Sequence, residues 1–157
     1  MWMRPGPQPT IVKRNKLSFN AIAAIGVIDA HGELILCETR PRSYTADSVL
    51  AFLHRLAPLM TKPCTLVLDN LACHRTSALA NFCSENHISI LFNGTYSSQY
   101  MPVERLWLFA KLYWRKEVGS ISNFKNETLL RRRIEHCIQR TPTQYLQKYV
   151  CTCKRRM

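Results

Sequence analysis

Short apolar runs alternate with segments of helical periodicity along this chain. The run F-N-A-I-A-A-I-G-V-I at 19–28 predicts a strand, and the turn residues D-A-H-G precede a second strand at 33–38. We expect these strands to form a hairpin. Thr45 precedes apolar residues at helical spacing and predicts the start of a helix, which Pro58 should weaken or end.

The second half of the chain predicts a strand, helix, strand unit. Apolar strands at Cys64–Leu68 and Ile88–Phe92 flank a predicted helix at 75–86, an order that favours parallel pairing and a right-handed crossover. Pro102 suits the first turn of a helix at 102–115, and further helices are expected at about 126–139 and 142–150. This order of elements predicts the α/β class, with a mixed sheet flanked by helices.

Charge narrows the choice of partners. The 157 residues, enough for about one domain, include 22 Lys and Arg against 10 Asp and Glu, a formal charge of +12. Such a field attracts polyanions, and nucleic acid is the commonest of these. An anionic membrane surface is the alternative, but no predicted helix combines a basic face with a Trp/Leu-rich face at low net hydrophobicity. No apolar stretch is long enough to span a membrane.

Cysteine usage indicates a reducing, intracellular environment. The chain has seven cysteines, an odd number, and no secretory signal pattern precedes them. Cys151 and Cys153, with His136 and Cys137, could be drawn as a zinc site. They lack the C-x₂₋₄-C pairs that structural zinc normally uses, so we expect no zinc there, and the role of Cys151 and Cys153 stays open.

Two carboxylates stand out by their positions. Asp69 follows the predicted strand directly, and ligands of open α/β sheets gather at the carboxyl ends of strands. Glu104 falls in the first turn of a helix, after a loop that returns from the neighbouring strand. Together the two could bind Mg²⁺ or Mn²⁺, which prefer oxygen ligands. Separately, Asp69 could cap the next helix and Glu104 could complement a helix N-terminus.

The segments around these carboxylates carry a family resemblance. L-V-L-D-N-L-A-C-H-R-T at 66–76 and Y-S-S-Q-Y-M-P-V-E-R-L-W-L-F-A-K-L-Y-W-R at 96–115 resemble the catalytic domain of Tc1/mariner and IS630-type transposases. The resemblance extends to W-x-R-x-G-x-x-P at 2–9 and to A-I-G-V-I-D-A-H-G-E-L-I at 24–35, and covers roughly residues 2–117. It implies an RNase H-like fold and a D-D-E/D carboxylate triad. Its second Asp and its Glu are separated by 34 residues, as Asp69 and Glu104 are.

The resemblance has departures. Gly94, Ser98 and Met101 stand where the family has proline, proline and asparagine, so the loop should be less rigid and a polar group beside the acidic site is lost. The first catalytic Asp would lie on a strand before Trp2, where no residue of this sequence is found. Asp29 is a poor substitute because it falls in the predicted hairpin turn. The expectation is an RNase H-like sheet that lacks its first strand, leaving the strands on either side unpaired.

The resemblance assigns roles to individual residues. It implies that Asp69 and Glu104 are catalytic and hold Mg²⁺ or Mn²⁺, weakly without the first Asp, because that residue bridges the two ions of a two-metal site. Asn70 and His74 match the D-N-x-x-x-H motif beside the site, and His74 is expected to hydrogen-bond nearby rather than to bind metal. Trp107 and Trp114 are expected in the core.

Basic residues on two predicted helices are candidates for contacts with DNA phosphates. A solvated helix face explains those on the first helix about as well. The candidates are Lys111, Arg115, Lys116, Arg131, Arg132 and Arg133.

These expectations divide the chain into an irregular lead-in (1–16), an N-terminally truncated RNase H-like core (17–117) and a basic helical extension (118–157). The predicted function is that of a remnant or fragment of a DDE transposase catalytic domain, with metal-dependent phosphoryl transfer on DNA, inactive alone. Its partner would be DNA, bound non-specifically, and a homodimer within a longer transposase stays open. A non-catalytic nucleic-acid-binding protein on the same scaffold is the alternative, and an unrelated RNase H-like nuclease is a third.

Overall fold

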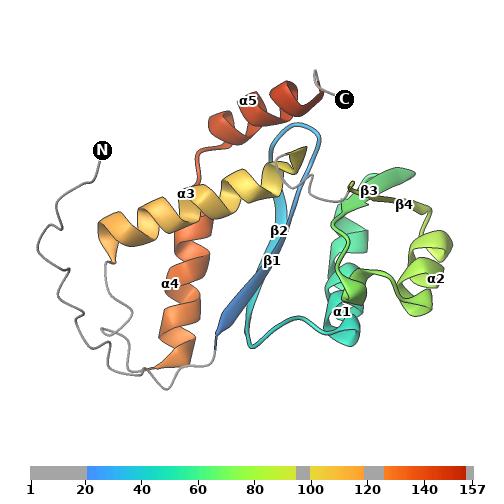
Figure 1. Cartoon of the computed structure of the whole chain (residues 1–157), viewed down its shortest axis with the longest axis horizontal. Coiled ribbons are helices and arrows are strands. Elements are labelled where there is room, and N and C mark those ends of the chain that lie inside the picture. Colours follow the sequence, from blue (N-terminus) through green and yellow to red (C-terminus); the bar gives the residue numbers. More distant parts are fainter. Residues whose placement is uncertain (1–20, 95–99, 119–125, 155–157) are drawn as a thin grey trace, which may run out of the picture.

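The structure is a computed structural model, in which residues 21–94, 100–118 and 126–154 are described (Figure 1). The side chains of residues 153 and 154 are not included. The predicted lead-in at 1–16, the motif at 2–9 and Ser98 lie outside the described residues. In order, the elements are β1 (Ile22–Ile28), β2 (Leu34–Pro41), α1 (Ala46–Leu56), the 3₁₀ turn η1 (Ala57–Leu59), β3 (Cys64–Leu68), the 3₁₀ turn η2 (Ala72–His74), α2 (Ser77–Glu85), β4 (Ile88–Phe92), α3 (Pro102–Glu117), α4 (Glu127–Gln139) and α5 (Thr143–Lys154).

The hairpin forms as predicted. β1 and β2 are antiparallel, with Ile22 opposite Pro41 and Val27 opposite Leu36. Asp29 organises the turn, because its Oδ1 accepts hydrogen bonds of 2.8 Å from the backbone N–H groups of both His31 and Glu33. Asp29 is therefore a turn residue, which agrees with its exclusion as a substitute catalytic group.

The strand, helix, strand unit also forms as predicted. β3 and β4 are parallel, with Cys64 opposite Ile88 and Leu68 opposite Phe92. The intervening helix α2 starts at Ser77, two residues later than expected, because Thr76 is its cap and accepts a hydrogen bond from Leu79 N–H. Helix α1 ends at Leu56 and is followed by the 3₁₀ turn that contains Pro58. This agrees with the expectation that Pro58 weakens or ends the helix.

Two separate cores hold the molecule together. One core packs α1 and α2 against β3 and β4 around buried Phe52, Leu56 and Leu79. The second core packs α3, α4 and α5 together around Leu106 and Ile138, and the hairpin strands pack against it. Burial of apolar side chains at both places is the main source of stability.

Trp107 belongs to this second core, as predicted, and Trp114 is half-buried. At Gly26 a Cβ atom would lie only 3.1 Å from the Trp107 ring, so the glycine of β1 allows the indole to approach the strand closely.

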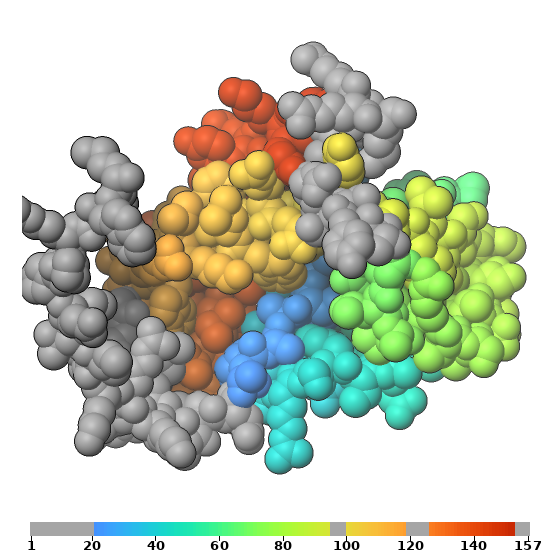
Figure 2. Space-filling view, viewed as in Figure 1, coloured from blue at the N-terminus to red at the C-terminus, as the bar shows by residue number. Residues whose placement is uncertain are grey.

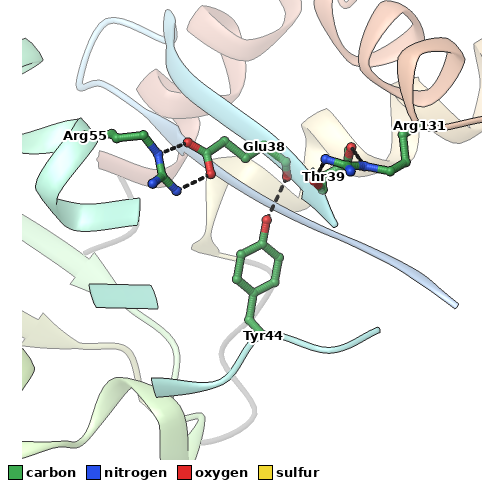
Figure 3. A network of polar contacts seen from close by, with 5 residues as sticks. All are labelled: Glu38, Thr39, Tyr44, Arg55 and Arg131. Carbon is green, nitrogen blue, oxygen red and sulfur yellow. Dashed lines mark hydrogen bonds and ion pairs between the residues drawn. The ribbon is translucent and has the colours of Figure 1, made fainter. Parts of the chain in front are cut away.

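A polar network links the two cores across β2 (Figure 3). Arg55 of α1 forms a two-pronged ion pair with Glu38, through Nε at 2.5 Å and Nη2 at 2.6 Å. The Tyr44 hydroxyl donates to the Glu38 carbonyl at 3.1 Å. On the opposite side, Arg131 of α4 donates to both the hydroxyl and the carbonyl of buried Thr39. β2 is thereby fixed to a helix of each core.

The described strands do not form one continuous sheet. The described strands form two sheets of two strands each, β1 with β2 and β3 with β4. In Figure 1 the two sheets stand apart, with the hairpin beside α3 and α4 and the parallel pair beside α1 and α2. The α/β class with flanking helices is confirmed. None of the helices described here is long and apolar enough to cross a membrane.

Candidate functional site

A groove of about 590 Å³ separates the two sheets. Residues 23–26 of β1 line one side, and Val67, Leu68 and Asp69 line the other. Helix α1 contributes buried apolar residues to it, and Val103 and Trp107 contribute from α3. In the space-filling view of Figure 2, the blue residues of β1 lie between α3 and the green residues around the end of β3. Asp69 therefore lies at the end of a strand and at the wall of a largely apolar groove.

Asp69 is held by its neighbours in the chain. Its Oδ1 lies 2.7 Å from Nδ1 of His74, and the backbone N–H of Leu71 donates to the same oxygen at 3.4 Å. The Asp69 side chain is 49% exposed, whereas that of His74 is only 11% exposed. Asp69 does not cap α2, because the cap of that helix is Thr76.

Asn70 joins the loops that follow the two parallel strands. Its Nδ2 donates to the carbonyl of Asn93, just after β4, at 2.5 Å. Its Oδ1 accepts from Arg75, whose guanidinium also lies over the Phe92 ring, 4.7 Å from the centroid. Arg75 lies beside the site and was not predicted from the sequence. Its position directly before the helix cap Thr76 is the local signal that could have placed it near Asn70.

Glu104 lies in the first turn of α3, where a negative charge complements the helix N-terminus. The residue is exposed, and its backbone N–H donates to the Met101 carbonyl at 3.1 Å, but its carboxylate has no hydrogen-bond or ion-pair partner within the described parts of the chain. Met101 and Val103, on either side of Pro102, line the same groove as Asp69, although Glu104 itself does not. Figure 1 shows this end of α3 directed towards the β3–β4 sheet. Asp69 thus lines the groove, whereas Glu104 directly follows a residue, Val103, that lines it.

The residues present do not complete a metal site. Among the described residues, no group of three His, Cys, Asp or Glu side chains is placed to hold a metal ion. Asp69 already shares one oxygen with His74, and Glu104 offers a single exposed carboxylate. A two-metal arrangement needs ligands that bridge both ions as well as ligands for each. Asp69 and Glu104 alone supply too few ligand oxygens to meet that requirement.

The predicted DNA-binding residues differ in what they contact. Lys111, Arg115 and Lys116 are exposed on α3, and Arg132 is exposed on α4. Arg133 is half-buried. Arg131 is engaged with Thr39, so its guanidinium is committed to holding α4 on β2. Within the described residues, none of the other five side chains has an ion-pair partner, and four of them are exposed.

The described cysteines differ in burial: Cys83 and Cys137 are buried, Cys151 is exposed, and Cys37, Cys64 and Cys73 are half-buried. Burial raises the pKa of Cys37 to about 12, with smaller contributions from Glu135 and Glu38. Burial likewise raises the pKa of Cys137, which is buried on α4. Cys151 is exposed on α5. His136 is exposed and Cys137 is buried, so these two neighbours on α4 face different surroundings.

Comparison with known proteins identifies the family. The family model for the DDE superfamily endonucleases matches residues 1–126, and the chain belongs to this family. Among solved structures, the chain is similar to the Mos1 transposase catalytic domain, which was solved with raltegravir and Mn. The TM-score is 0.69 at 14% sequence identity, over 89% of this chain and 74% of that one. No curated protein matches the chain.

These findings confirm the family and the fold expected from the sequence. The D-N-x-x-x-H and P-V-E-x-x-W segments that carried the resemblance lie within the matched range. The likeness to the Mos1 catalytic domain confirms an RNase H-like arrangement of the elements.

Proposed function

We propose that this chain is a DDE-type transposase domain of the Tc1/mariner and IS630 kind that binds DNA but does not cut or join it alone. Asp69 and Glu104 are its two metal-holding carboxylates, with Asn70 and His74 as neighbours of the site. Mg²⁺ or Mn²⁺ is the expected ion, bound weakly. Action on DNA would place the protein inside the cell, in the nucleus of a eukaryote.

The observation that carries this proposal is the divided sheet beside Asp69. The carboxylate stands at the end of β3, which pairs on one side with β4 and, among the described residues, borders a groove on the other. Paired with Glu104 from α3, it supplies two oxygen ligands, and hard divalent ions bound by only two carboxylates keep most of their water. Two such ligands are a poor basis for fixing a pair of ions close together.

Nicking of supercoiled plasmid tests the catalytic half of the proposal. The full chain, at stoichiometric excess over DNA in Mg²⁺ or Mn²⁺, should give no more open-circle product than the Asp69→Ala variant. Nicking that requires divalent metal and disappears in both Asp69→Ala and Glu104→Gln would overturn the proposed inactivity. The Asp47→Ala variant is a matched control, because Asp47 is an exposed acidic residue in the first turn of α1.

A second candidate function is non-catalytic binding of nucleic acid on the same scaffold. The formal charge of +12 and the exposed cations of α3 favour it. Affinity for duplex DNA should then fall steeply with salt, because bound cations release counterions from the phosphates. Identical affinities for the wild type and Asp69→Ala, with and without EDTA, would support this function over a metal-dependent one. A loss of affinity on adding EDTA would contradict it.

The proposed division into a lead-in, a core and a basic extension needs one qualification. Helices α4 and α5, from the predicted extension at 118–157, share the second core with α3. We therefore propose that the extension folds with the core and presents Arg132 and Arg133 from its surface. We propose a homodimer only for a longer transposase that contains this chain.

A further inference from the structure

A seam of paired side chains lies between α3 and α5, formed by Arg105 and Phe109 of α3 with Tyr145 and Tyr149 of α5. The ring centroids of Phe109 and Tyr145 are 5.0 Å apart, with the rings tilted by 37°. One helical turn away, the guanidinium of Arg105 lies over the Tyr149 ring, 4.4 Å from its centroid. The two helices therefore run antiparallel here, as Figure 1 shows, and the two aromatic positions are about 6 Å apart along each helix.

Tyr145 is more exposed than the packing of α5 requires. Leu146 and Val150 hold the helix in place and are 2% and 5% exposed. Tyr145, directly before Leu146, is 57% exposed although its ring contacts Phe109. Tyrosine combines a large apolar ring with a polar tip, and such side chains are enriched at binding surfaces. The seam thus offers an aromatic ring to a partner.

The rings of the seam lie among cations. Arg105 and Lys148 are exposed, and neither has an ion-pair partner within the described residues. Lys148 follows Tyr145 by three positions on α5, so their side chains share a face of the helix. Helix α5 contains no Asp or Glu. In Figure 2 the surfaces of α3 and α5 adjoin on the face shown, so ring and charge belong to one surface.

The chemistry of this surface selects a single strand of nucleic acid. Phosphates suit Arg105 and Lys148, and the face of a base suits the Tyr145 ring. In a duplex the faces of the bases are covered by their stacked neighbours, so only an unpaired strand can offer them to an aromatic side chain. An acidic peptide would satisfy the cations but would leave the ring without a stacking partner.

We propose that the seam between α3 and α5 binds single-stranded nucleic acid, with Tyr145 as its stacking residue and Arg105 and Lys148 as its phosphate contacts. Binding should show little sequence preference, because every base has a π-face. The inference rests on the proposed function only in taking nucleic acid as the partner. It uses none of the basic residues named above as candidates for DNA contacts.

Fluorescence anisotropy with the full chain tests the proposal. The probes are labelled oligo-dT and a dA·dT duplex of equal length, compared at one salt concentration because affinity depends steeply on salt. Tyr145→Ala should weaken binding of oligo-dT about tenfold, since it removes a ring on which a base stacks. Tyr145→Phe keeps the ring and should stay within about twofold of the wild type. Neither variant should change duplex affinity by more than about twofold, because the phosphate contacts remain.

Leu129→Ala is the matched control. Leu129 is 55% exposed and lies on α4, which contributes no residue to the seam. This variant should bind oligo-dT like the wild type. A loss as large as that of Tyr145→Ala would overturn the proposal, and so would an equal loss of duplex affinity in Tyr145→Ala.

A second variant decides the matter if Tyr145→Ala fails to fold. Lys148→Ala should reduce the slope of log K against log salt for oligo-dT by about 0.7, the share of one phosphate contact on a single strand. Lys148→Arg should restore the slope. An unchanged slope in Lys148→Ala would overturn the proposal.

Photochemical crosslinking locates the bound strand. Oligo-dT in which one thymine is replaced by iodouracil should crosslink to Tyr145, because this base reacts with an aromatic ring on which it is stacked. Crosslinks found only outside α3 and α5 would overturn the proposal. Binding of polyglutamate that depends on Tyr145, without binding of oligo-dT, would indicate an acidic protein partner and would also overturn it.

The two probes separate this inference from the proposed function. Binding of the duplex without binding of oligo-dT would overturn the inference and leave the proposed function in place. Binding of oligo-dT that depends on Tyr145, without binding of the duplex, would support the inference and contradict the proposed binding of duplex DNA.

Discussion

Nδ1 of His74 lies 2.7 Å from Oδ1 of Asp69, and the two side chains differ sharply in burial. His74 is almost enclosed at the end of the η2 turn, whereas Asp69 is half-exposed at the groove. The histidine therefore fixes the position of the Asp69 carboxylate. His74 is the histidine of the D-N-x-x-x-H motif, five residues after Asp69. The prediction that His74 hydrogen-bonds nearby is confirmed.

The burial difference predicts unequal effects of substitution on stability. His74→Ala should lower the free energy of unfolding by about 1–3 kcal/mol, because it removes a packed ring and the partner of Asp69. Asp69→Asn should cost under about 1 kcal/mol, since the amide keeps an acceptor and the site is open to water. Urea unfolding at neutral pH measures both. His31→Ala is the control, because His31 is exposed and its backbone N–H, not its ring, bonds to Asp29; a loss as large as that of His74→Ala would contradict the assignment.

Neighbouring arginines on α4 should have opposite roles. Arg131 holds Thr39, whose hydroxyl also donates to Glu135 at 2.5 Å, whereas Arg132 is exposed. Arg131→Ala should destabilise the fold by about 1–3 kcal/mol, because the buried Thr39 carbonyl loses its donor and Glu135 loses a nearby cation. Arg132→Ala should stay within about 0.5 kcal/mol. Thermal or urea unfolding of the two variants separates these roles.

The same pair has a second readout in DNA binding. If Arg132 contacts a phosphate, Arg132→Ala should reduce the slope of log K against log salt by about one. Arg131→Ala, measured under conditions where it is folded, should leave the slope unchanged. A lower slope for Arg131→Ala alone would show that this guanidinium leaves Thr39 to bind DNA.

Gly32 in the hairpin turn should not accept a side chain. Its φ is +86°, and a Cβ atom there would lie 2.5 Å from the backbone nitrogen of Gln147 in α5. Gly32→Ala should therefore destabilise the protein by about 1–3 kcal/mol, through both the backbone conformation and the forced separation of α5 from the turn. Gly26→Ala is the comparison, since its added Cβ would meet the edge of the Trp107 ring at 3.1 Å and the ring can shift. Unfolding curves for the two variants should show the larger loss at Gly32.

Local patterns were enough to predict most elements of this fold. The apolar runs and turn residues predicted the hairpin and the β3–α2–β4 unit, because strand propensity, turn chemistry and helix capping act over a few residues. That β1 and β3 do not pair with each other followed from the family resemblance. An observed helix boundary differed from the predicted one where a capping residue set the helix start, as Thr76 does for α2.

The site was predictable only in part, because its contacts join distant segments. His74 could be placed near Asp69 from their spacing. Nothing in the basic run R-R-R shows that Arg131 turns inward to Thr39, 92 positions earlier, while Arg132 stays in solvent. The groove likewise depends on how β1, β3, α1 and α3 pack together. Such partners are fixed by tertiary packing, which a single sequence records only indirectly.

Alkaline pH should weaken the fold through Cys37. Burial, with smaller contributions from Glu135 and Glu38, raises the pKa of its thiol from 9.0 to about 12, so the folded state favours the neutral thiol. A group whose pKa is raised on folding contributes stability that is complete below its unfolded pKa and is lost as the pH rises towards the folded one. The free energy of unfolding should therefore fall between about pH 9 and pH 12.

Tyr44 should also lower the free energy of unfolding at alkaline pH. Burial, followed by the charge of Glu38, raises the pKa of its hydroxyl from 10.0 to about 12. Cys37→Ala should flatten the lower part of the pH dependence, from about pH 9, and Tyr44→Phe the part above about pH 10. Urea unfolding at several pH values measures this, with Cys151→Ala as the control because Cys151 is exposed. An unchanged pH profile in Cys37→Ala would mean that its thiolate is tolerated in the folded protein, contrary to its burial beside two carboxylates.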